Sequence, residues 1–143
     1  MGKIKWARVL IGGLVAGVVI NALQFAAWAL LGRPSLSATL KALGFSLKET
    51  PGITVLWAAM YFVFVILFIW LYASIRPRYG AGPRTAVVAG LAAGVLLLIP
   101  DIEWGSVLTM IPARMWAIDA GSSMVIAVVA TLLGAWVYKE QAP

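Results

Sequence analysis

Apolar residues dominate four long stretches of this chain, and most polar residues gather in the segments between them. The stretches cover residues 9–31, 53–75, 85–100 and 115–138. A helix needs about 20 apolar residues to cross the hydrocarbon core of a bilayer, with a range of about 17–25. The third stretch is short unless its helix starts within the preceding loop or continues past Pro100, and the others are long enough. The pattern predicts four membrane-spanning helices.

A shorter segment, residues 35–47, has an amphipathic pattern. Its leucines recur at helical spacing, namely Leu36, Leu40, Leu43 and Leu47. Such a helix is typical of a membrane surface, and docking of a partner through the leucines is the alternative. Residues 101–111 are a second candidate. We therefore predict a single all-α domain over residues 1–143, an integral membrane four-helix bundle with one or two short interfacial helices on its outer face.

Composition supports a lipid environment and excludes several kinds of chemistry. Of 143 residues, 63% are hydrophobic and 11% are charged, whereas soluble domains carry about 25% charged residues. The chain has no cysteine and no histidine, which removes thiol nucleophiles, the commonest general base and most transition-metal ligands. We expect no catalytic, cofactor-binding or metal site. The net charge of +6 lies in loops between spans, so we expect no nucleic acid partner either.

The loop charges predict an orientation. With four spans, both termini and the middle loop share one side, which holds seven of the eleven basic residues: Lys3, Lys5, Arg8, Arg76, Arg78, Arg84 and Lys139. The opposite side holds the other four: Arg33, Lys41, Lys48 and Arg114. Because short loops rich in Lys and Arg stay in the cytoplasm, we expect both termini to be cytoplasmic.

Small and polar residues form stripes along three spans, as membrane helices need in order to pack together. The stripes are Gly13, Gly17, Asn21, Gln24 and Trp28 in the first span, Ala86, Gly90, Gly94 and Leu97 in the third, and Asp119, Ser123, Ala127, Ala130 and Gly134 in the fourth, with Ser122 and Thr131 beside them. The two GxxxG matches in these stripes are explained by packing within the bundle or by a contact between copies. The second span is bulky almost all round, and we expect it to be the most exposed to lipid.

Asn21 and Gln24 fall near the middle of the first span, where an amide must find a hydrogen-bond partner. One interpretation is a bond to Ser122, Ser123 or Thr131 of the fourth span. The other is a polar path for a substrate or ion. No charged residue lies at the midplane of any span, which argues against a proton-coupled exporter.

The remaining candidates are charged. Asp101 and Glu103 form an outer acidic cluster near Arg114 and Asp119. Carboxylates can bind Ca²⁺ or Mg²⁺ or perform acid–base work, but helix capping and interfacial anchoring explain this pair as well. Asp119 is the acid for which we expect partial burial, with Arg114 or a serine as its neighbour.

The loop after the second span carries Arg76, Arg78 and Arg84, which we expect to contact lipid headgroups or another phosphate. With its flanks, the run LYASIRPRYGAGPRTAVVAGLAAG resembles part of an uncharacterised family of small four-span bacterial membrane proteins that have an RPR-aromatic-G-x-GP turn. The resemblance covers about 25 residues. It implies the bacterial inner membrane and no assigned reaction.

From these features we expect a non-catalytic small inner-membrane protein, an accessory or structural component of a membrane assembly or a homo-oligomer. Its expected partners are membrane lipids and either a membrane protein or a second copy. The alternative is a small oligomeric transporter or channel with a polar path near Asn21 and Gln24. An embedded enzyme, using the outer acidic cluster, is a third hypothesis.

Overall fold

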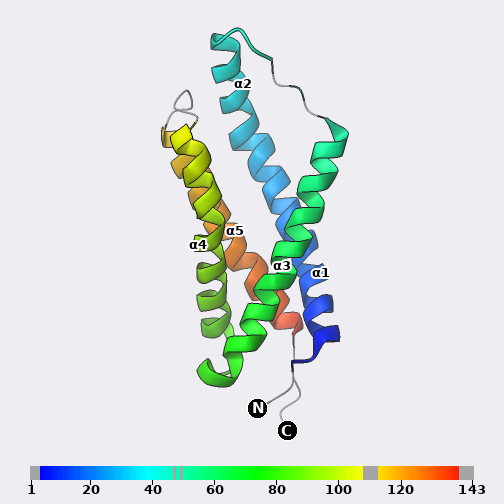
Figure 1. Cartoon of the computed structure of the whole chain (residues 1–143). Coiled ribbons are helices and arrows are strands. Elements are labelled where there is room, and N and C mark those ends of the chain that lie inside the picture. Colours follow the sequence, from blue (N-terminus) through cyan, green and yellow to red (C-terminus); the bar gives the residue numbers. More distant parts are fainter. Residues whose placement is uncertain (1–3, 47, 49, 108–112, 139–143) are drawn as a thin grey trace.

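The computed structural model describes residues 4–46, 48, 50–107 and 113–138, and only the backbone of residues 100–107. Its elements are α1 (Trp6–Ala27), the π-helical segment η1 (Trp28–Gly32), α2 (Arg33–Ala42), α3 (Pro51–Tyr79), α4 (Pro83–Val107) and α5 (Ala113–Val137). Four long helical rods stand side by side in Figure 1, and the described residues contain no strand. The predicted all-α bundle is confirmed.

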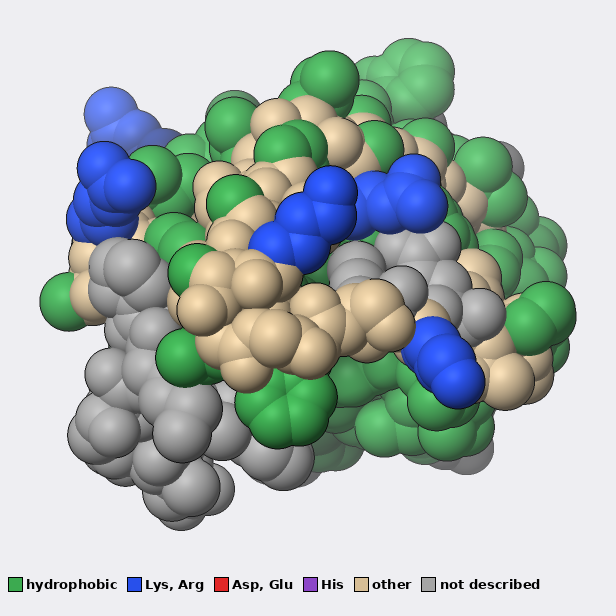
Figure 2. Space-filling model, turned by 90° about the horizontal axis from the view of Figure 1, so that it is seen from above, with side chains coloured by type: hydrophobic (Ala, Val, Ile, Leu, Met, Phe, Trp, Pro, Cys, Tyr) green, Lys and Arg blue, Asp and Glu red, His purple; other side chains and the backbone are tan. Residues whose placement is uncertain are grey.

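Three of the rods are long and apolar enough to cross a membrane: Trp6–Ala42, Pro51–Tyr79 and Ala113–Val137. Many large hydrophobic side chains lie on the outside of the bundle, and hydrophobic side chains form much of its periphery in Figure 2. Such a surface is typical of contact with lipid rather than water. In its most apolar stretch α3 is 17% buried, against 33% and 39% for the other two rods. Among these three, the second span is indeed the most exposed.

The four rods form a ring. The α1 helix packs on α3 and α5, and α4 packs on α5 and α3 to close the ring. The start of α1, the end of α5 and the turn between α3 and α4 lie at one end of the bundle in Figure 1. We call this end the terminal end, and the opposite end, where α2 lies, the distal end. The shared end is the arrangement that an even number of spans requires.

Glycines bring the helices together in the terminal half. A Cβ atom on Gly12 of α1 would lie 2.8 Å from the carbonyl oxygen of Gly134 in α5. On the other side of α1, a Cβ on Gly13 would lie 2.6 Å from Cγ1 of Ile66 in α3. Between α4 and α5, a Cβ on Gly90 would lie 2.8 Å from Cα of Val128. Since no real Cβ fits at these distances, the helices approach closely because these residues are glycines.

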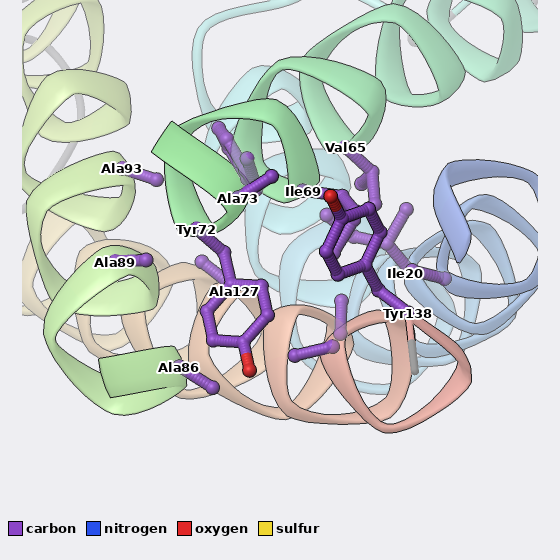
Figure 3. Close-up of a cluster of buried hydrophobic side chains, with 14 of the residues drawn as sticks. Ile20, Val65, Ile69, Tyr72, Ala73, Ala86, Ala89, Ala93, Ala127 and Tyr138 are labelled. Carbon is purple, nitrogen blue, oxygen red and sulfur yellow. The ribbon is translucent and has the colours of Figure 1, made fainter. Parts of the chain in front are cut away.

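Most residues of the small-residue faces lie in buried packing surfaces, although Trp28 and Asp119, at the ends of two of these faces, are exposed. Alanines of α4 and α5 line the core in Figure 3, together with Ile20 of α1 and Val65, Ile69 and Tyr72 of α3. Both GxxxG segments take part in this packing, since Gly13 and Gly17 face α3 whereas Gly90 and Gly94 face α5. The motifs therefore serve contacts within the chain.

The segment predicted as a surface helix at residues 35–47 differs in the structure. There α2 continues α1 through η1, giving one helix from Trp6 to Ala42 that points away from the bundle. Pro34 has no N–H to donate, and its ring would crowd a carbonyl one turn earlier. The wider π turn, with the Arg33 N–H bonded to the Trp28 carbonyl, absorbs this conflict without breaking the helix.

The third span is longer than residues 85–100. The α4 helix begins at Pro83 and continues past Pro100 to Val107. A proline inside a helix removes one hydrogen bond, but membrane helices tolerate that loss. Of the second predicted interfacial segment, residues 101–107 thus belong to α4, and residues 108–111 lie outside the described part of the chain.

Candidate functional site

A polar cluster joins three helices midway along the bundle. Gln24 of α1 donates from Nε2 to the hydroxyl of Tyr61 in α3 at 3.0 Å and to Oγ of Ser123 in α5 at 3.4 Å. Among the predicted residues, the structure thus brings Gln24 and Ser123 together. A side chain that bonds to two neighbouring helices fixes their relative positions.

Asn21 lies one turn before Gln24 and bonds in the same way. Its Nδ2 donates to the carbonyl of Gly17 at 2.8 Å and to the carbonyl of Ala58 in α3 at 3.3 Å. Within the described residues, its Oδ1 is buried and accepts no hydrogen bond. The amide therefore contributes to packing and leaves one acceptor for a donor from outside the described chain.

Ser122 and Asp119 do not join this cluster. The Ser122 hydroxyl donates to the backbone carbonyl of Asp119 at 2.9 Å, one turn earlier in α5. The Asp119 side chain is exposed, unlike Ser123 of the same predicted stripe. The stripe on α5 is thus buried from Ser123 toward the end of the helix, but its first residue, Asp119, lies outside the core.

The outer acidic cluster cannot be assembled from the described side chains. Asp101 and Glu103 fall on the last turns of α4, where the structure describes the backbone alone. Arg114 is exposed at the start of α5. Among the described residues there is no group of three or more acidic, histidine or cysteine side chains that could hold a metal ion.

The three arginines of the basic loop divide into two kinds. The Arg76 guanidinium lies 5.8 Å from the ring centroid of Tyr138, a cation–π contact. Tyr138 in turn meets Tyr72 edge to face, with centroids 6.1 Å apart. Arg78 and Arg84 are exposed. Arg76 thus helps to hold α3 against the end of α5, while Arg78 and Arg84 face the surroundings of the terminal end.

The turn between these arginines is closed by its own hydrogen bonds. Thr85 donates from Oγ1 to the carbonyl of Gly80 at 2.8 Å, and it is buried. Gly80 has a φ of 84°, in the left-handed region that favours glycine. This closure fixes the start of α4 close to the end of α3.

Sequence reasoning missed the partners from the second span. Tyr61 and the Ala58 carbonyl complete the polar cluster, but α3 looks uniformly bulky in sequence. Tyr61 lies 37 residues from Gln24, and a match at that separation requires the register of two helices. The contact between Tyr138 and Arg76 was missed as well, because it depends on the packing of α3 against the end of α5.

Comparison with known proteins gives no relative: no protein-family model matches the chain, and no curated protein or solved structure matches it significantly. The geometry of the bundle is therefore the basis for a functional proposal.

Proposed function

We propose that this chain is a non-catalytic accessory or structural component of a membrane assembly, and that its distal half binds the helix of a partner protein or of a second copy. One observation carries the proposal. Every residue from 51 to 57 in α3 is exposed, so the first two turns of this helix bury no side chain in the bundle. Large apolar side chains are among them, with Val55 69% and Trp57 57% exposed.

The first helix is likewise packed against its neighbours in its terminal half and exposed in its distal half. Its terminal half is held by Gly12, Gly13 and Gly17, which are all buried. Further along, Phe25 is 45% and Leu30 76% exposed, on different faces of the helix. The rods diverge toward the distal end in Figure 1. Lipid gives helices no hydrophobic reason to associate, so close packing holds them together, and no residue of this helix after Ile20 is buried in such packing.

The polar cluster supports a structural role over transport. Asn21 and Gln24 both direct their donors to other helices, so these amides stabilise the bundle. A transporter would need them to line an open path. The Oδ1 of Asn21, which is buried and accepts no hydrogen bond from the described residues, is the single feature that favours the alternative.

The proposed location is the bacterial inner membrane with the terminal end in the cytoplasm. The described basic residues of that end are Lys5, Arg8, Arg76, Arg78 and Arg84, and those of the distal end are Arg33, Lys41, Lys48 and Arg114. With Lys3 and Lys139, the sequence assigns seven basic residues to the terminal end and four to the distal end. This excess follows the positive-inside rule. The family resemblance of the basic loop supports a bacterial source.

Site-specific photocrosslinking in living cells tests the proposal. A photoreactive residue at Leu56, 61% exposed in the distal half, is compared with one at Val88, 50% exposed in the terminal half. We expect a discrete protein adduct from position 56, either a dimer of this chain or one larger partner, and only lipid adducts from position 88. Lipid adducts alone at both positions, together with a monomer in native mass spectrometry from mild detergent, would refute the proposal.

A further inference from the structure

A groove runs between α3 and α4 on the outside of the bundle. It encloses about 270 Å³, and all of its lining side chains are apolar, among them Phe64, Leu67 and Leu71 of α3 and Ala93, Leu96 and Leu97 of α4. Leu67 and Leu96 are more than half exposed, at 51% and 63%, so the groove opens outward. In a bilayer, this opening faces the lipid chains.

The groove lies in line with an arginine. At 3.6 residues per turn, residues seven apart share a face of a helix. Phe64, Leu71 and Arg78 therefore lie on one face of α3, in this order toward the terminal end. The distance along α3 from Phe64 to Arg78 is about 21 Å at 1.5 Å per residue. Half of a bilayer, from headgroups to midplane, measures about 20–22 Å. The groove and Arg78 therefore span the depth of one lipid leaflet.

The charge of this surface is of one sign. Between residues 50 and 100 the chain contains three arginines and no acidic residue. Arg76 is engaged with Tyr138, whereas Arg78 is exposed on the helix face of the groove. A guanidinium at headgroup level favours a phosphate that carries net negative charge.

The volume of the groove limits which kind of molecule can fit in it. An α-helix with its side chains is about 10–12 Å across, too thick to enter a hollow of 270 Å³ between two packed helices. A single acyl chain is narrow and apolar throughout, and a void in the membrane would leave the lining side chains without contacts.

We propose that this groove, together with Arg78, binds one anionic phospholipid, with an acyl chain along the groove and the phosphate at Arg78. The site lies between α3 and α4, away from the distal turns of α3 that form the proposed partner surface. The two proposals are therefore independent.

Native mass spectrometry of the full-length protein tests the site. The protein is reconstituted in vesicles with equal parts of phosphatidylglycerol and phosphatidylcholine. It is then extracted with a mild detergent, from which it is released in the mass spectrometer. We expect one phosphatidylglycerol retained per chain, in preference to phosphatidylcholine. Arg78→Gln should lower this retention about fivefold, since one basic residue near the surface contributes about 1 kcal/mol to anionic-lipid binding. Arg84→Gln is the matched control. Arg84 lies nine residues before Ala93, on the opposite face of α4 from the groove, so this substitution should leave retention unchanged.

A second pair of variants tests the groove. Leu96→Trp places a large ring at its mouth and should reduce retention of phosphatidylglycerol at least as much as Arg78→Gln. Leu91→Trp makes the same change at a position 45% exposed on another face of α4 and should not. Equal retention of both lipids, or equal effects of Arg78→Gln and Arg84→Gln, would show ordinary boundary lipid and overturn the proposal. A lipid-free dimer that Leu96→Trp dissociates would overturn it as well, in favour of a second copy in the groove.

Discussion

At the scale of single residues, glycine determines how closely these helices approach. Gly12 faces the backbone of α5 and Gly13 faces the backbone and side chain of Ile66 in α3, so α1 is held on two sides. Gly121, in the same helix as Gly134, has nothing within 4 Å of where a Cβ would lie. The chain thus contains a tightly packed glycine and an unpacked one, which differ only in their surroundings.

We predict that Gly12→Ala lowers the free energy of unfolding by about 1–3 kcal/mol, as overpacking does. The added methyl would lie 2.8 Å from the Gly134 carbonyl oxygen, so backbone must move. Gly121→Ala is the control and should be neutral or stabilising by up to about 1 kcal/mol, because alanine favours the helix. Unfolding in mixed micelles, followed by circular dichroism, measures both. Equal effects of the two substitutions would contradict the packing role of Gly12.

The hydrogen bond between Gln24 and Tyr61 allows a second prediction at this scale. In a double-mutant cycle, Gln24→Leu and Tyr61→Phe should show a coupling energy of about 0.6 kcal/mol, and at most about 1.7 kcal/mol, the range found for such bonds within membrane proteins. The same unfolding measurement applies to the two single variants and the double variant. Strictly additive effects would mean that the 3.0 Å contact contributes nothing to stability.

At the scale of elements, the unbroken helix from Trp6 to Ala42 is the main departure from expectation. The leucine pattern at residues 35–47 indicated a helix, and the structure has one that ends at Ala42. The same pattern fits a helix that lies flat on the membrane and one that projects from it. The sequence analysis treated residues 9–31 and 35–47 as separate helices, whereas the π turn at Trp28–Gly32 joins them into one. By contrast, the faces of α4 and α5 were predictable because small residues are directly visible in sequence, and in lipid they have few other uses.

Cysteine labelling distinguishes a projecting α2 from a flat one, and the absence of native cysteine makes it simple. Single cysteines at Leu36, Leu40 and Lys41 should all react with a water-soluble maleimide in membrane vesicles, because a projecting helix is surrounded by water. A helix lying in the interface would protect Leu36 and Leu40 and leave Lys41 reactive. That periodic protection would contradict the observed direction of α2.

At the scale of the whole molecule, the terminal end gathers the start of α1, the α3–α4 turn and the end of α5. We predict that cysteines at Lys5 and Arg84 react from the same side of the membrane and that one at Lys41 reacts from the other. In intact cells, a membrane-impermeant reagent should label only Lys41→Cys, since basic loops stay in the cytoplasm. Labelling of Arg84→Cys in intact cells would reverse the proposed orientation.

The length of the first helix has a mechanical consequence. Its 37 residues extend about 55 Å, whereas the hydrocarbon core of a bilayer is about 30 Å thick. The helix is held by close packing at Gly12, Gly13 and Gly17 and by the hydrogen bonds of Gln24, and its tip at Ala42 lies about 27 Å beyond Gln24. A tilt of about 10° at Gln24 would move the tip by about 5 Å, close to one helical turn. α2 is therefore a lever arm: a small reorientation within the membrane becomes a large displacement outside it.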